Sequence, residues 1–163
     1  MKLTRSRGLA LALVVIVALD WITKFLVQNH VRLYSRRVVV DGWLWLLHSP
    51  NTGVAFSFAD GIPAALRIPL LATVAAVGIA VAARIALRTD DEWMRLAAVL
   101  VMAGAVGNLG DRVMNGWVTD FILVRWFPFV FNVADMAITA GAILLAWRML
   151  LAPPPPAATP VEP

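Results

Sequence analysis

The residues best suited to chemistry lie between Gly107 and Met136, in a stretch flanked by long apolar runs. Ionisable residues at membrane depth are costly, so they face a protein interior or a wet cavity and usually mark function. We therefore expect this stretch to bring two aspartates together beside a cleft that faces lipid. Its chemistry-bearing residues are the aspartates Asp111, Asp120 and Asp135, the asparagines Asn108 and Asn132, and the arginine Arg112.

Two common kinds of hydrolytic site find little support in the sequence. Serine hydrolysis needs a nucleophile activated by a base, yet none of the four serines lies in a G-x-S-x-G setting, and only His30 and His48 could act as bases. A zinc site would need histidine or cysteine ligands at suitable spacing, and the chain has neither a cysteine nor an H-E-x-x-H motif. We expect no metal and no cofactor.

Paired aspartates remain as the candidate catalytic groups. Two carboxylates held close together cannot both ionise easily, so one of them keeps a proton. The ionised carboxylate can take a proton from water, while the protonated one polarises and then protonates a scissile amide. This chemistry predicts peptide hydrolysis through water, without a covalent intermediate.

The composition is that of a membrane protein. The chain has 163 residues, 61% of them hydrophobic and 15% charged, and its mean hydropathy is +0.79. Soluble domains carry roughly 25% charged residues. The formal charge of +4 forms no basic run, so nucleic-acid binding is not expected. We expect one integral membrane domain over residues 1–151 and a disordered, proline-rich cytoplasmic tail over residues 152–163.

Four apolar runs predict transmembrane helices, and these must position the aspartates. Between the first two helices, Asp41-Gly42 separates strand-like runs, which is a hairpin signal. The predicted fold class is an all-α membrane protein with four transmembrane helices and a small extracytoplasmic β element. The expected helices span about residues 8–28, 62–88, 93–113 and 132–151.

Spacing along the helices predicts that polar groups meet at one depth. Basic residues are shared equally between the two sides, but the basic start of the first helix favours cytoplasmic termini. Asp20, Asn108 and Asp135 each lie 13 residues from an arginine near the inner boundary. Thirteen residues climb roughly 20 Å in a core about 30 Å thick. We therefore expect one site near the outer leaflet.

Five sequence blocks, in this order, resemble the lipoprotein signal peptidase (signal peptidase II) family. The resemblance covers nearly the whole chain except the tail. The blocks are Asp20-x-x-x-Lys24, Asn51-Thr52-Gly53-Val54-Ala55-Phe56, Gly107-Asn108-Leu109-Gly110-Asp111-Arg112, Val118-Thr119-Asp120-Phe121 and Phe131-Asn132-Val133-Ala134-Asp135.

The resemblance implies an aspartic endopeptidase with Asp120 and Asp135 as the catalytic pair. It implies cleavage of bacterial prolipoproteins before a diacylglyceryl-modified cysteine, by an enzyme of the bacterial plasma (inner) membrane. We also expect a monomer that contacts membrane lipids. Two positions depart from the family pattern: Thr119, where valine is usual, and Met136, where serine or threonine is common. The residues expected to bind substrate or support the pair are Asp20, Lys24, Asn51, Gly53, Asn108, Asp111, Arg112 and Asn132.

Structural roles remain open for several of these residues. Asp20 and Lys24 lie one helical turn apart and could form a simple ion pair, and Asp111 could pair with Arg112. Asn51 and Gly53 could only build a turn. The glycines Gly104, Gly107 and Gly110 would allow close helix packing.

Two other functions are compatible with intramembrane carboxylates. A small proton-coupled carrier also uses them, although carriers usually show internal repeats, and we find none at the level of motifs. A non-enzymatic membrane scaffold is the second alternative.

Overall fold

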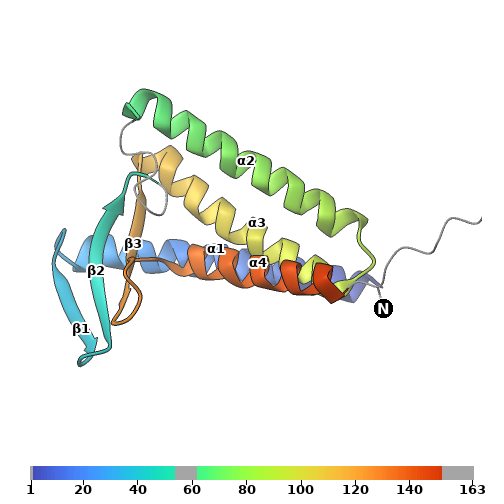
Figure 1. The fold of residues 1–163 in the computed structure, drawn as a ribbon, viewed down its shortest axis with the longest axis horizontal. Coiled ribbons are helices and arrows are strands. Elements are labelled where there is room, and N and C mark those ends of the chain that lie inside the picture. The colour runs from blue at the N-terminus through green and yellow to red at the C-terminus, as the bar shows by residue number, and fades with distance from the viewer. Residues whose placement is uncertain (1, 54–61, 152–163) are drawn as a thin grey trace, which may run out of the picture.

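The computed structural model describes residues 2–53 and 62–151, which form four long helices with a three-stranded sheet at one end (Figure 1). Each helix contains a segment long and apolar enough to cross a membrane, so the predicted fold class is confirmed. The bounds differ slightly from those expected, most of all at the start of the first helix, because no proline interrupts the chain there. The helices are α1 (Lys2–His30), α2 (Ala64–Arg88), α3 (Glu92–Asn115) and α4 (Val133–Leu151).

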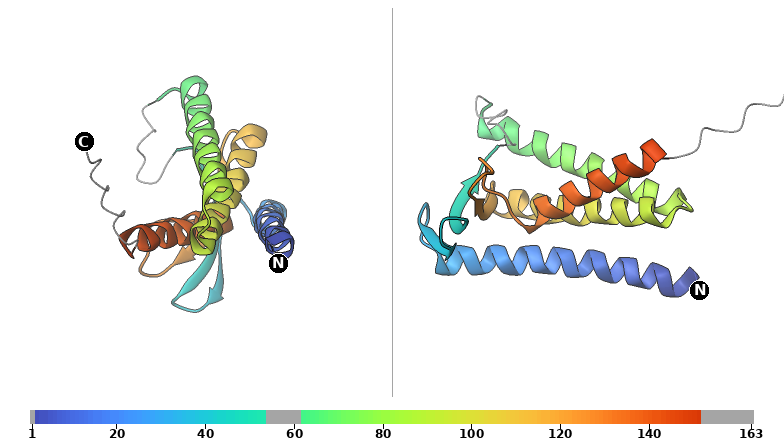
Figure 2. Two further views of the ribbon diagram at one scale, coloured as in Figure 1. Left: turned by 90° about the vertical axis from the view of Figure 1, so that its right-hand side faces the viewer. Right: turned by 60° about the horizontal axis from the view of Figure 1, so that its bottom comes forward.

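The central element of the bundle is α3. It packs against α1, α2 and α4, and it is the most buried of the four helices. In Figure 1 α3 lies between α2 and α4, and in the right-hand view of Figure 2 it lies between α2 and α1. Because α3 carries Asn108, Asp111 and Arg112, their side chains can reach groups on several neighbours at once.

The glycines of α3 let the neighbouring helices approach closely, as predicted. A Cβ on Gly104 would overlap the carbonyl oxygen of Ala134 in α4. A Cβ on Gly110 would lie 2.8 Å from the ring of Trp21 in α1. Small residues at such contacts allow helix backbones to approach within van der Waals distance. Gly107, between these two, faces a carboxylate that belongs to the site described below.

The sheet contains the strands β1 (Arg36–Val40), β2 (Leu44–Asn51) and β3 (Val118–Val124), in that order and antiparallel. The predicted hairpin between β1 and β2 is present, with Gly42 at φ +69°. Strand pairing resumes only at Leu44, so Trp43 joins Asp41 and Gly42 in the loop. The third strand was not predicted, because its partner lies some seventy residues upstream in the sequence and no local pattern reports that pairing.

The end of the bundle away from the sheet is closed by polar contacts between helix ends. Asp91 caps α3 by accepting hydrogen bonds from the backbone N–H groups of Trp93 and Met94 at 2.8 and 3.1 Å. The Nε of Arg148, in the last turn of α4, donates to Asp91 at 2.9 Å. The first residues of α1 and the last of α4 both lie at this end (Figure 1).

Two expectations fall outside the described residues. These are the strand-like run from Val54 to Phe58 and the disordered tail over residues 152–163.

Candidate active site

Asp120 lies on β3, where pairing with β2 brings it beside an asparagine. Ser49 pairs with Asp120 and Asn51 pairs with Val118 in the antiparallel register. The side-chain Nδ2 of Asn51 donates to Asp120 Oδ2 at 2.8 Å. Its Oδ1 accepts from the backbone N–H of Gly53 at 3.0 Å. Asn51 therefore builds a turn and also supports the aspartate, so the two roles left open by the sequence coexist.

Asp135 lies in the first turn of α4 and is held by Asn132, the residue just before that helix. The backbone N–H of Asp135 donates to Asn132 Oδ1 at 2.9 Å, and the backbone N–H of Asn132 donates to Asp135 Oδ2 at 3.2 Å. This reciprocal arrangement resembles a capping box, which satisfies free N–H groups at a helix start. The carboxylate of Asp135 is thus fixed by local backbone geometry.

One buried asparagine joins the two aspartates. The Nδ2 of Asn132 donates to Asp120 Oδ1 at 2.7 Å, while its backbone N–H holds Asp135. The side chain of Asn132 has no exposed surface. Because buried polar side chains are costly unless fully hydrogen-bonded, Asn132 has little freedom to move. It fixes the position of one carboxylate relative to the other.

Asn108, on α3, extends this network from α4 to two further helices, α3 and α1. Its Nδ2 donates to Asp135 Oδ1 at 2.8 Å. Its Oδ1 accepts from Asn132 Nδ2 at 3.2 Å and from Lys24 Nζ at 3.0 Å. Both oxygens of Asp135 therefore have donors. Asn108 contacts Asp135 directly and is linked to Asp20 through Lys24, while the common membrane depth of Asp20, Asn108 and Asp135 stays a prediction.

Lys24 holds two further carboxylates. Its Nζ lies 2.7 Å from Asp20 Oδ2 and 3.3 Å from Asp111 Oδ2. Asp20 Oδ1 accepts from the backbone N–H of Ala134, at the start of α4, at 2.9 Å. The ion pair left open for Asp20 and Lys24 forms, yet it also anchors α1 to α4. A Cβ on Gly107 would lie 2.5 Å from Asp20 Oδ2, so only glycine leaves room for this carboxylate.

The pairing suggested for Asp111 and Arg112 is not the one found. Asp111 takes Lys24 as its ion-pair partner and accepts from the backbone N–H of Thr119 at 2.8 Å. Successive residues of a helix point about 100° apart, so neighbours rarely face the same partner. Arg112 instead donates to the carbonyl oxygen of Gly53 at 3.3 Å and of Asn108 at 3.4 Å.

Burial sets the protonation of Asp120. Its side chain is 3% exposed, and desolvation raises its pKa, with the nearby charge of Asp135 adding to the effect. Hydrogen bonds from Asn51 and Asn132 and the charge of Lys24 act in the opposite direction. The net result is a pKa of about 7. At neutral pH a large fraction of Asp120 therefore carries a proton, as a carboxylate pair requires for acid–base work.

Sequence reasoning missed one residue that supports the strand carrying Asp120. Gln28 Nε2 donates to Thr119 Oγ1 at 2.6 Å, and Thr119 is fully buried directly before Asp120. A signal was present, because Asp20, Lys24 and Gln28 follow each other at four-residue intervals on one face of α1.

The two departures from the expected motif differ in their surroundings. Thr119 uses its hydroxyl group in the hydrogen bond from Gln28. Met136 is 53% exposed, so it lies outside the buried network around Asp135.

The chain resembles known proteins along most of its length. Lipoprotein signal peptidases of Pseudomonas syringae pv. tomato and Pseudomonas aeruginosa are 46% and 40% identical to it over 143 and 144 residues. Each alignment covers 83% of this chain, and 82% and 83% of the respective relatives.

Two solved structures share the fold, and both are described as bacterial membrane enzymes. One has a TM-score of 0.80 and 26% identity, over 88% of this chain and 87% of the other. The second has a TM-score of 0.81 and 25% identity, over 90% and 94%. The sequence model described as signal peptidase (SPase) II matches residues 12–151. These findings do not favour the carrier or the scaffold, and the chain belongs to the signal peptidase II family.

Proposed function

We propose that this membrane peptidase cleaves bacterial prolipoproteins before a diacylglyceryl-modified cysteine, with Asp120 and Asp135 as its catalytic pair. The observation that carries the assignment is the double contact of Asn132, which donates to both carboxylates from a fully buried position. The names of the relatives support the substrate class.

In the proposed reaction the two aspartates begin in different protonation states. Asp120, with a pKa raised to about 7 by burial and by Asp135, starts as the acid. Asp135, which is half-buried, starts as the base. Asp135 takes a proton from water as the water oxygen bonds to the scissile carbonyl carbon, and Asp120 gives its proton to the carbonyl oxygen.

Breakdown of the resulting diol returns both groups to their starting states. The proton on Asp135 passes to the leaving nitrogen as the carbon–nitrogen bond breaks. Asp120 takes a proton back from a hydroxyl group of the diol, which leaves a carboxylic acid product. No group of the enzyme is consumed, and no covalent intermediate is needed.

The remaining polar residues hold the pair in this arrangement. Asn51 and Asn108 each donate to one aspartate, and Arg112 interacts electrostatically with both. Asp20, Lys24 and Asp111 join α1 to α4 and to the backbone beside Asp120. Gly53 supplies a backbone carbonyl to Arg112. In the proposal these residues position the carboxylates and line the approach of the substrate.

The proposal also covers the placement of the enzyme in the bacterial inner membrane. Residues 1–151 form a single monomeric domain with both termini in the cytoplasm, and the site lies near the outer leaflet among membrane lipids. Its support is that the sheet, in which β3 carries Asp120, lies at the end of the bundle opposite the start of α1 and the end of α4 (Figure 1).

The test is cleavage of a diacylglyceryl precursor peptide and of its unlipidated twin by the purified protein in membranes. We expect Asp120→Asn and Asp135→Asn each to lower the rate by roughly 10²–10⁴-fold, the range of general acid–base catalysis. Asp41→Asn, in the exposed hairpin loop, makes the same chemical change away from the site and should leave the rate unchanged. Normal cleavage by both site variants would disprove the catalytic assignment, and equal cleavage of the two peptides would disprove the substrate class.

A further inference from the structure

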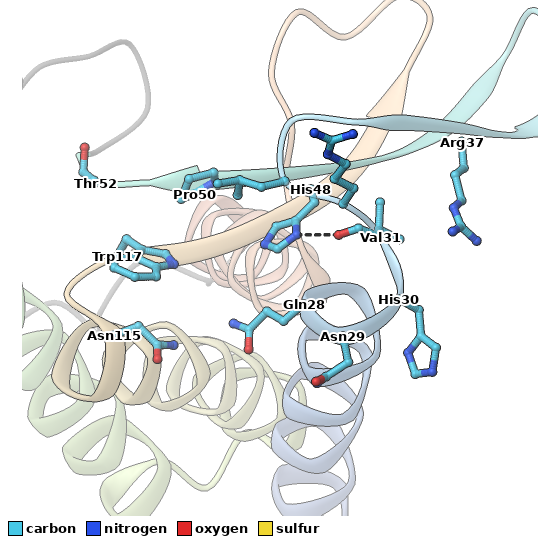
Figure 3. Close-up of a pocket in the computed structure, with 12 residues that line it drawn as sticks. Gln28, Asn29, His30, Val31, Arg37, His48, Pro50, Thr52, Asn115 and Trp117 are labelled. Atoms are coloured by element: carbon cyan, nitrogen blue, oxygen red, sulfur yellow. Dashed lines mark hydrogen bonds between the residues drawn. The ribbon is translucent and has the colours of Figure 1, made fainter.

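A hollow of about 850 Å³ lies at the sheet end of α1, separate from the aspartate pair. Its wall includes Gln28 and His30 from α1, His48 and Pro50 from β2, and Trp117 beyond α3. In Figure 3, His30 and Arg37 lie on one side of it, Asn115 and Trp117 lie on the other, and His48 projects between them. Its size falls within the range of small-molecule binding sites.

Among the described residues, the side chains that line the hollow are either basic or uncharged. Arg32 and Arg37 contribute guanidinium groups, and none of the described residues in the wall carries a carboxylate. Within the described part of the chain, neither arginine has a carboxylate at ion-pair distance. His48 is 8% exposed, and its Nδ1 donates to the carbonyl oxygen of Val31 at 2.8 Å, which orients the ring within the wall. Such a lining suits an anion.

The position of the hollow narrows the kind of anion. It lies where the membrane-length segment of α1 ends, at His30, and the phosphates of a bilayer lie just outside its apolar core. On the turns of α1 that precede it, Ile22, Phe25 and Leu26 are 55%, 62% and 48% exposed. These residues share a helix face with Asn29 and His30 at the hollow. A molecule held there could lay acyl chains along this face.

We propose that the hollow binds the headgroup of an anionic phospholipid, with the phosphate between Arg32 and Arg37 and the acyl chains along α1. A zwitterionic lipid fits less well, because its ammonium group would meet no carboxylate among the described residues of the wall. The lipid carried by the proposed substrate does not fit either, since a diacylglyceryl thioether has no phosphate.

The hollow shares a wall with the strands that carry the site. Gln28 lines it and donates to Thr119, the residue before Asp120. Pro50 and Thr52 also line it. They flank Asn51, whose side chain lies on the other face of the strand and contacts Asp120. Bound lipid would therefore stabilise the segments on which the aspartate depends.

The test compares two short-chain lipids added to the purified protein in neutral detergent. Dioctanoyl phosphatidylglycerol should bind and raise the unfolding temperature, and dioctanoyl phosphatidylcholine should bind much more weakly. The double variant Arg32→Gln/Arg37→Gln should weaken phosphatidylglycerol binding about 30-fold, given two arginines acting on one anionic lipid. Both side chains are exposed, so the unfolding temperature without lipid should not change.

A matched control separates a built site from general attraction of positive charge. Arg36→Gln/Arg125→Gln removes the same charge near the sheet, from side chains that lie over Trp45 and Trp43 and do not line the hollow. This variant should keep wild-type affinity. Equal losses in the two double variants, equal binding of the two lipids, or an equal effect of inorganic phosphate alone would overturn the proposal. Binding is measured without substrate, so the result is independent of the catalytic assignment.

Discussion

Asn51 offers a direct test of how the site controls the proton on Asp120. Its Nδ2 donates to Asp120 Oδ2 at 2.8 Å, and this bond favours the ionised carboxylate, so it lowers the pKa of Asp120. Burial and the charge of Asp135 outweigh it and keep the pKa near 7. Replacing Asn51 with Ala removes an opposing interaction, so the pKa of Asp120 should rise further.

The size of the change follows from the strength of such a bond. A hydrogen bond to a charged group contributes about 1.5–3 kcal/mol, but Asn51 is only half-buried and water can replace part of it. About half of that energy should therefore be lost. A change of one pKa unit corresponds to about 1.36 kcal/mol, so the pKa should rise by about one unit. In the proposed mechanism activity needs Asp120 protonated, so the alkaline limb of the pH profile should move upward by that amount.

The assay is kcat/KM for the lipidated precursor peptide between pH 5 and 10. Asn51→Asp gives a second variant, because its carboxylate can still accept from Gly53 but cannot donate to Asp120. It should move the same limb in the same direction. Asn29→Ala is the control, since Asn29 is exposed and donates only to the carbonyl oxygen of Phe25. A lower rate with an unmoved alkaline limb in both Asn51 variants would refute the role of Asp120 as the proton donor.

Two further predictions concern stability in detergent. Gly107→Ala should lower the free energy of unfolding by about 1–3 kcal/mol, because the new methyl group would lie 2.5 Å from Asp20 Oδ2. Gly78→Ala, with nothing within 4 Å, should not destabilise, and equal effects of both changes would contradict the packing argument. The second prediction is that stability falls as pH rises from about 4 to 7. Folded Asp120 keeps its proton up to about pH 7, whereas the unfolded residue loses it near 3.8, so the folded state binds more protons in this window. Thermal unfolding across that range should show a shallower fall for Asp120→Asn, and an unchanged slope would count against the raised pKa.

The helices were predictable because each is a long apolar run with its own local signal. The strand carrying Asp120 was not, since Val118–Val124 forms only by pairing with β2 far upstream in the sequence. That pairing is also what brings Asn51 to the aspartate. The sequence motifs could therefore point to both residues without indicating how they meet.

The roles of individual site residues were harder to predict than their membership of the site. Asn132 was expected to support the pair, but its simultaneous contact with both aspartates depends on the chain turning from β3 into α4. Likewise, the partner of Asp111 is set by helix rotation, which turns it towards Lys24 rather than its sequence neighbour Arg112. Such choices depend on tertiary geometry and leave no trace in local spacing.

The distribution of charge gives an independent reason for a retained proton. The site gathers four carboxylates and two cations, and Lys24 is committed to Asp20 and Asp111. Arg112 interacts electrostatically with Asp120 and Asp135 while its hydrogen bonds go to backbone carbonyls. The charge of Lys24 also reaches Asp120, from its ion pairs with the other two carboxylates. With every carboxylate ionised the site would carry two uncompensated negative charges, which a poorly hydrated site disfavours. Binding one proton on the pair halves that excess, so the commitment of Lys24 to Asp20 and Asp111 favours a retained proton on the pair.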